Sequence, residues 1–411
     1  MAVTLRTQRV VRSVVAFTGV IAGSNVAVSA ATYQWNGTTN TSWQTASNWS
    51  ASPGAPVSGG TTTETDRLNV YNGVNSPLIY TAVEGNTTFD RVVIGSGGAA
   101  FNGAMQITGG TFTTRTGGDI ISNNLGAGSL TVNGGTYVTS SSLTLNNTAN
   151  ANAVFTVTSG SATTPSINLK SGGATNSIVN LDGGTLAVTT ITATAGGTNV
   201  FNFNGGTLIA TGTTPTYTTN IANVRNGGAI INTNGRTFSL AQPLTHSTIL
   251  GDAATDGGLT KNGTGMLTIT GVNTYTGDTT VNAGTLTLSS TSETRFVLAD
   301  GDVSNSVTGT GVVNLNGLFR IDVAGLTADS GEWQLVDITT LSETFSATTF
   351  SLAFVGGPSF TNEGGGLYTS GDWAFETTTG VLSLTTAVPE PGAIGLAGCG
   401  LFALLGRRVR K

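Results

Sequence analysis

The sequence predicts an all-β protein whose body is a right-handed parallel β-helix, or β-solenoid, closed by a β cap at each end. Three observations support this prediction. Glycine accounts for 59 of 411 residues, while charged residues make up only 9%. A short pattern of alternating apolar and polar residues around Gly-Gly-Thr recurs along the chain. Helical periodicity is absent, and the runs rich in Thr, Val and Ile favour extended strands.

Residues 1–30 have the three parts of a secretory signal peptide. A start with three arginines precedes a mostly apolar stretch from Ser13 to Val28. Val28 and Ala30 then supply the small side chains that signal peptidase needs at the −3 and −1 positions. An uncleaved membrane anchor is the alternative, but Gly23-Ser24-Asn25 interrupts the apolar stretch. We therefore expect cleavage after Ala30.

Residues 31–90 are expected to form an N-terminal aromatic cap, because they contain Trp35, Trp43 and Trp49. The first coil of a solenoid exposes strand edges that promote aggregation, so a bulky cover is expected there. The three tryptophans fit the core of this cap. The alternative is an exposed aromatic platform that stacks on sugar rings.

Residues 91–290 carry the repeat that predicts the solenoid. The second glycine of each copy recurs every 22–25 residues, at Gly110, Gly135, Gly160, Gly184 and Gly206. Weaker copies at Gly235 and Gly284 extend the series. This interval is too short for a propeller blade of about 40 residues but suits one solenoid turn. A stacked antiparallel sandwich is the alternative.

The chemistry of each copy explains how it would fold. Alternation buries one face of each strand, and glycine supplies the positive-φ corner that other residues resist. About eight coils, stacked at about 4.8 Å, would form a rod about 40 Å long. One coil cannot bury its inward face alone, so stability must come from stacking.

Residues 258–288 carry a second signal. Gly258-Leu259-Thr260-Lys261-Asn262-Gly263 leads, after a short connection, to Val281-Asn282-Ala283-Gly284-Thr285-Leu286. This segment resembles the autotransporter-associated, or passenger-associated, β-strand repeat of surface proteins. The resemblance implies a β-helical scaffold for this part of the chain.

Residues 291–387 differ from the repeat. They contain more Phe, Leu, Asp and Glu, include Trp333 and Trp373, and have little Gly-Gly-Thr. We expect a C-terminal β cap or a small β-sandwich here.

Residues 388–411 have the construction of a sorting tail. Pro389, Glu390 and Pro391 precede an apolar run over 392–406, and the chain closes with a basic cluster made of Arg407, Arg408, Arg410 and Lys411. This order resembles the PEP-CTERM sorting signal of Gram-negative bacteria. The resemblance implies a short transmembrane helix over 392–406, with the basic cluster acting as a stop-transfer signal in the cytoplasm.

The same resemblance implies a route of export. Exosortase would cut near Pro389-Glu390-Pro391 after a transient stay in the inner membrane, and would release the body to the cell surface, outer envelope or extracellular matrix. An uncut tail anchor needs the same residues and remains the alternative. Membrane contact is expected only through the C-terminal helix.

The charge balance excludes one class of partner. Seven of the 16 basic residues lie in the two ends, which leaves 9 basic and 20 acidic residues between them, a net charge of about −11. A surface this acidic repels phosphate backbones, so we expect no nucleic-acid binding.

The sequence predicts no catalytic, cofactor-binding or metal-binding residue. His246 and Cys399 are the only histidine and cysteine, which excludes a Cys/His zinc cluster and an intrachain disulfide. We expect a plain acidic turn at Asp300-Gly301-Asp302 and a surface or hydrogen-bonded role for His246. The acids of the repeat region are scattered, and the sequence shows no paired acids repeated at coil spacing with an Arg or Lys: Asp119, Asp182, Asp252, Asp256 and Asp278.

These observations predict an exported, non-enzymatic protein of the cell surface or extracellular matrix with a structural or adhesive role. Signal peptidase and exosortase would be its partners during export, and exopolysaccharide or other surface glycans its partners afterwards. Two alternatives share the scaffold. One is a polysaccharide lyase or glycoside hydrolase, since parallel β-helices include such enzymes, and the other is a spacer that binds nothing.

Overall fold

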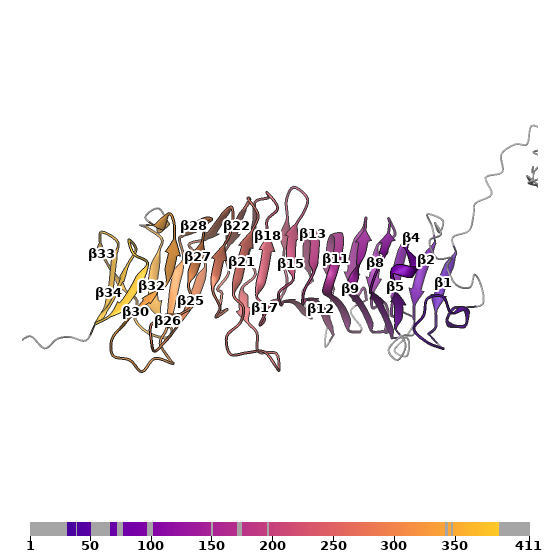
Figure 1. Ribbon diagram of the computed structural model, residues 1–411, viewed down its shortest axis with the longest axis horizontal. Helices are drawn as coiled ribbons and strands as arrows, with labels where there is room; N and C mark the ends of the chain where they lie inside the picture. The colour runs from indigo at the N-terminus through magenta and orange to yellow at the C-terminus, as the bar shows by residue number, and fades with distance from the viewer. Residues whose placement is uncertain are drawn as a thin grey trace, which may run out of the picture.

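The computed structural model describes residues 31–385, except 38, 51–65, 72–76, 97–101, 149–150, 171–174, 195–196, 342–343 and 347. The described chain forms a long rod, with β1 (Thr32–Trp35) at one end and β33 (Thr361–Gly364) at the other (Figure 1). The predicted signal peptide and sorting tail lie outside these residues. Within the described ranges, no helix is long and apolar enough to cross a membrane. Two short 3₁₀ turns lie there, η1 (Ala46–Asn48) and η2 (Ala82–Glu84), and Leu341 also has 3₁₀ conformation.

The rod is a parallel β-solenoid of about ten turns, and the predicted fold class is confirmed. Each complete turn supplies three strands, and each strand pairs in parallel with its equivalents in the turns before and after it. A stacked antiparallel sandwich is therefore excluded for the body. We name the three resulting sheets the first, second and third face, in the order in which the chain crosses them in one turn.

The first face begins near the N-terminus and runs almost the length of the rod. Two long strands, β9 and β11, also turn the corner onto the second face. In the stack of the first face, residues 272–274 lie between β20 and β25 and hydrogen-bond to both strands. The strands of the first face are β3 (Leu78–Tyr80), β6 (Gly103–Ile107), β9 (Gly128–Thr139), β11 (Ala153–Leu169), β12 (Asn176–Leu181), β14 (Thr198–Phe203), β17 (Ile221–Val224), β20 (Leu244–His246), β25 (Glu293–Ala299), β29 (Leu318–Asp322) and β32 (Ser351–Phe354).

The second face follows each glycine corner. It includes the later parts of β9 and β11. Its other strands are β4 (Asn86–Phe89), β7 (Thr111–Thr114), β13 (Thr185–Ala193), β15 (Thr207–Ala210), β18 (Ala229–Asn232), β21 (Leu259–Asn262), β23 (Thr279–Val281), β27 (Val307–Gly309) and β31 (Val336–Ile338).

The third face completes each turn. It includes β1 and the last residues of β11 and β13. Its other strands are β2 (Arg67–Val70), β5 (Arg91–Ile94), β8 (Asp119–Ile121), β10 (Ser142–Leu145), β16 (Thr216–Tyr217), β19 (Phe238–Leu240), β22 (Met266–Ile269), β24 (Thr285–Leu288) and β28 (Val312–Leu315).

The predicted glycine corners lie between the first and second faces. Gly160, with φ of 78°, shows why glycine is required, since an added Cβ would lie 2.2 Å from the carbonyl oxygen of Gly135 in the turn below. The same corner continues at Gly228 and Gly258.

The prediction that Gly235 and Gly284 continue the same series of glycine corners was wrong. Both residues have positive φ, but they lie at the next corner, between the second and third faces. Every corner of the solenoid favours a compact residue with positive φ, so glycine spacing alone does not identify which corner a residue occupies.

The parallel stack extends beyond residues 91–290 in both directions. It begins where β1 pairs with β2 and ends where β29 pairs with β32. The expected N-terminal cap therefore consists of true solenoid coils with an aromatic cluster inside them. Trp35, Trp43 and Trp49 are at most 4% exposed, so the aromatic platform for sugars was a wrong alternative.

The C-terminal end is closed by an antiparallel sheet. Trp333 on its edge strand is buried and stacks on Trp373 at a ring-centroid distance of 5.5 Å. Phe375 packs against the aromatic rings of the last solenoid turn. The strands of this sheet lie in the order β30 (Gly331–Gln334), β36 (Val381–Leu384), β35 (Trp373–Glu376), β34 (Leu367–Ser370) and β33.

The interior of the rod is made of apolar rows in register. On the first face, one such row consists of fully or almost fully buried side chains at Met105, Leu130, Phe155, Val179, Phe201, Ala222 and Leu244. Stacking equivalent apolar side chains excludes water from every turn except the first and last. The caps at both ends follow from this requirement.

Lys261 is an exception inside this apolar core. It occupies an inward position of β21, between Ile231 and Val281 in the neighbouring turns, and is 0% exposed. Its Nζ lies 3.1 Å from Thr233 Oγ1 and donates to three carbonyl oxygens, those of Asn262, Gly263 and Ala283, at 3.1, 2.7 and 2.9 Å. The ammonium therefore ties together the backbone of a corner, and no carboxylate among the described residues pairs with it.

Burial lowers the pKa of Lys261 to about 8. The folded chain therefore binds fewer protons than the unfolded chain between pH 8 and the ordinary lysine pKa near 10.4, so stability rises with pH in that window. We expect the free energy of unfolding to increase by roughly 1–2 kcal/mol from pH 8 to pH 9.5, and Lys261→Met to abolish this increase. Urea denaturation of both proteins across this range measures it. Equal slopes for the two proteins would contradict the assignment.

Candidate functional site

The outward side of the second face carries a row of hydroxyl groups, which we call the hydroxyl row. Its members occupy one register position in successive turns, and the row is interrupted once, by Ile230. Most of these hydroxyls have no hydrogen-bond partner among the described residues. The members are Thr111, Thr136, Ser161, Thr185, Thr207, Thr260, Thr280 and Thr308.

The outward side of the first face carries a different row, in which amides bond to one another. Asn202 Nδ2 donates to Asn180 Oδ1 at 2.8 Å, and Asn223 Nδ2 donates to Asn202 Oδ1 at 2.8 Å. Thr156 and Thr245 continue the bonding at the two ends. Because these groups satisfy each other, this ladder holds turns together and leaves little for a ligand.

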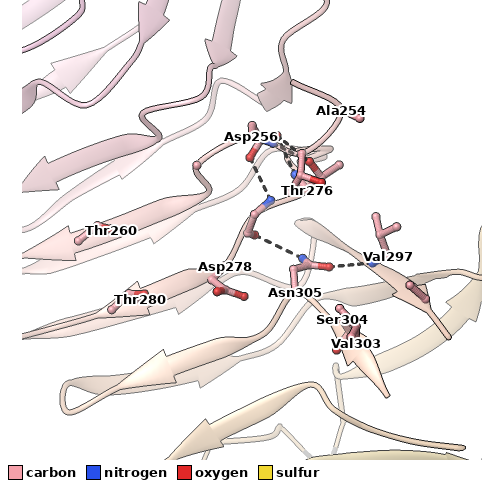
Figure 2. Close-up of a pocket in the computed structure, with 14 residues that line it drawn as sticks. Ala254, Asp256, Thr260, Thr276, Asp278, Thr280, Val297, Val303, Ser304 and Asn305 are labelled. Atoms are coloured by element: carbon pink, nitrogen blue, oxygen red, sulfur yellow. Dashed lines mark hydrogen bonds between the residues drawn. The ribbon is translucent and has the colours of Figure 1, made fainter. Parts of the chain in front are cut away.

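A cavity of about 550 Å³ opens at the second face, where the hydroxyl row passes Thr260 and Thr280. We call it the groove. Its floor is the corner formed by residues 276–278, and its two sides are residues 254–257 and the hairpin of β25 and β26 (Val303–Ser304). Figure 2 shows Thr260 and Thr280 on neighbouring strands, across the groove from the side chains of the hairpin.

Asp256 lies at the groove but is fully engaged by donors. Its side chain is 1% exposed. Its Oδ1 accepts from the backbone N–H groups of Gly258 and Gly277, and its Oδ2 accepts from the N–H and hydroxyl of Thr276. His246 Nδ1 lies 2.8 Å from the same Oδ2. Asp256 thus fixes two neighbouring turns to each other, and His246 is hydrogen-bonded as predicted.

Asp278 is the open carboxylate of the groove. It is exposed, and its Oδ1 accepts from the backbone N–H of Ser306 at 2.8 Å and from the Ser306 hydroxyl at 3.3 Å. Its Oδ2 has no partner within the part of the chain that the structure describes. Among the described lining residues, this oxygen and the hydroxyls of Thr255, Thr260, Thr280 and Ser304 are left free for a ligand.

The structure brings two of the scattered acids, Asp256 and Asp278, to the same cavity, with no Lys or Arg among its described lining residues. Both line the groove, and they belong to successive turns. Asp278 lies one residue before Thr279, the register partner of Leu259, whereas Asp256 lies three residues before Leu259, so the two acids are offset and do not stack. Their roles differ, because one carboxylate is saturated with donors while the other faces the groove.

The remaining acids of the repeat region have structural partners. Asp252 binds Arg225 at 2.9 Å, and this hydrogen bond lowers the pKa of the carboxyl group. Asp182 lies outward at a corner, as predicted, 3.6 Å from the same guanidinium. Asp119 is completely buried, and burial raises its pKa to about 6 although Thr114, Tyr137 and the Val92 N–H donate to it.

The acidic turn at Asp300-Gly301-Asp302 is also structural. The Thr327 hydroxyl donates to Asp300 Oδ2, and the backbone N–H groups of Thr327 and Ala328 donate to its Oδ1; these bonds, that from the hydroxyl first, lower the pKa of Asp300. Within the described ranges, no three His, Cys, Asp or Glu residues gather into a metal site. The predicted sorting and cleavage residues lie outside the described residues.

Comparisons with known protein families match the chain in two places. Residues 259–288 match the Passenger-associated-transport-repeat, and residues 387–411 match the PEP-CTERM protein-sorting motif. No curated protein and no solved structure matches the chain. Both resemblances inferred from the sequence are confirmed, within a residue or so of the expected bounds. The first match covers the segment from β21 to β24, and the floor of the groove lies within this segment. The chain is thus an exported surface β-solenoid protein that carries a passenger-associated-transport-repeat and a PEP-CTERM protein-sorting motif.

Proposed function

We propose that this protein is a structural, adhesive rod of the cell surface or extracellular matrix, without enzymatic activity. In this proposal the tail delivers the rod to exosortase, and the rod then holds surface polysaccharide. The hydroxyl row carries the proposal, because it presents free hydroxyls at the spacing of the solenoid turns, about 4.8 Å. A regular polymer can bind such a row at several positions at once, so individually weak contacts add up.

The groove supports binding over catalysis. Glycoside hydrolysis needs two carboxyl groups, one as acid and one as nucleophile or base, that both reach the sugar. Asp256 is tied to backbone N–H groups and is 1% exposed, so Asp278 is the one carboxylate free to meet a ligand in the groove. A lyase needs a basic residue as proton acceptor, and no Lys or Arg lines the groove.

The test is to incubate the full chain with a panel of neutral and acidic polysaccharides. We expect the protein to be retained on at least one insoluble glycan, with no release of reducing ends or unsaturated products. Product release would establish an enzyme and contradict the proposal. Failure to bind any glycan would contradict it too, and would favour a spacer that only sets distance from the cell.

A further inference from the structure

The groove differs from the rest of the hydroxyl row in having walls. Along most of the second face, the row lies on an open sheet. At Thr260 and Thr280, residues 254–257 rise on one side and the β25–β26 hairpin on the other. A cavity of about 550 Å³ falls within the range of sites that enclose small ligands.

The lining of the groove combines two kinds of surface. The hydroxyls of Thr260, Thr280 and Ser304 and the free Oδ2 of Asp278 provide polar contacts. Val297 and Val303 provide apolar contacts from the hairpin, and Val303 is 60% exposed. A pyranose ring has hydroxyls around its rim and C–H groups on its faces, so this mixture matches its surface.

The charge of the groove selects among glycans. The charged residues that line it are Asp256 and Asp278, both acidic, and no described cation lines it. The body of the chain carries about −11 as a whole. Uronates, sulfates and phosphates would therefore meet like charge on entering, whereas an uncharged sugar would donate its hydroxyls to Asp278.

We propose that the groove is the binding subsite for a short stretch of uncharged polysaccharide. Thr260, Thr280 and Asp278 contact sugar hydroxyls, and the hairpin valines cover a ring face. This inference rests on the proposed adhesive function, and it adds the place of binding and the class of sugar. The coil that matches the passenger-associated repeat forms the floor, while both walls come from residues outside the matched segment.

The experiment uses the full chain and four trisaccharides as probes: cellotriose, maltotriose and triacetylchitotriose, with trigalacturonate as the charged comparison. The variant is Thr260→Val/Thr280→Val, which keeps the side-chain shape and removes two hydroxyls. The matched control is Thr190→Val/Thr216→Val, two register neighbours on the third face, outside both the hydroxyl row and the groove. Titration calorimetry measures affinity, and retention on the insoluble glycan measures adhesion.

We expect at least one neutral trisaccharide to bind, and the groove variant to weaken it roughly tenfold, while the control variant changes it little. Asp278→Asn should reduce the discrimination against trigalacturonate. Tighter binding of trigalacturonate than of every neutral probe would overturn the inference. If the two double variants weaken trisaccharide binding equally while adhesion stays intact, the groove is not the subsite. The adhesive function would still stand. If the unaltered chain neither binds a probe nor adheres to any glycan, both proposals fail.

Discussion

Gly160→Ala is expected to destabilise the solenoid by roughly 2–5 kcal/mol. A side chain at φ of 78° costs about 1–2 kcal/mol by itself. The new Cβ would also lie 2.2 Å from the carbonyl oxygen of Gly135, a backbone atom that cannot move without separating two turns. Thermal or urea unfolding of the purified chain measures the loss.

The control for this substitution is Gly301→Ala. Gly301 has φ of 79°, and an added Cβ there meets nothing within 4 Å. The two variants therefore share the conformational cost and differ only in the clash between turns. If Gly160→Ala loses no more stability than Gly301→Ala, the close stacking of glycine corners is not what the sequence repeat encodes.

Trp43→Ala is expected to be the most damaging change at the N-terminal end, at about 3–5 kcal/mol. Trp43 is 1% exposed and packs edge-to-face against Trp49 and Tyr80, with ring centroids 5.0 and 5.4 Å apart. Its carbonyl oxygen also accepts from Trp49 Nε1 at 2.7 Å. Removing the ring leaves a cavity at the end of the rod and weakens the cover of the first coil.

The damage should stay local, because each turn contacts only its neighbours. Hydrogen exchange should show lost protection in β1, β2 and β5, and unchanged protection in β21–β24. Trp43→Phe serves as the milder comparison: it keeps an aromatic ring and removes an indole N–H that lacks a partner among the described residues. A Trp43→Ala protein with wild-type unfolding and exchange would show that the tryptophan cluster is not the cap core.

Much of the fold could be predicted because the repeat is local. Gly-Gly-Thr with alternating flanks specifies a strand, a tight corner and a second strand, and equal spacing indicates that such units stack. The extent of the stack was less predictable. β1 and β2 belong to it although a long segment separates them in sequence, since strand pairing tolerates long insertions between turns.

The candidate site was harder to predict than the fold, because insertions build it. Periodicity indicates that Thr260 and Thr280 stack, but not that residues 254–257 and the β25–β26 hairpin rise beside them. Lys261 was missed for a related reason. Its inward position follows from the alternation of β21, yet the carbonyl groups that accept from it belong to a corner whose shape the sequence does not reveal.

We expect this rod to be exported, trimmed at both ends and displayed at the surface. Intact-mass spectrometry of the protein recovered from the cell surface tests it most directly. We expect a product that begins at Ala31 and ends near Pro389-Glu390-Pro391, without the apolar run and the terminal basic cluster. Recovery of the whole chain, with residues 1–30 and 392–411 still attached, would contradict it.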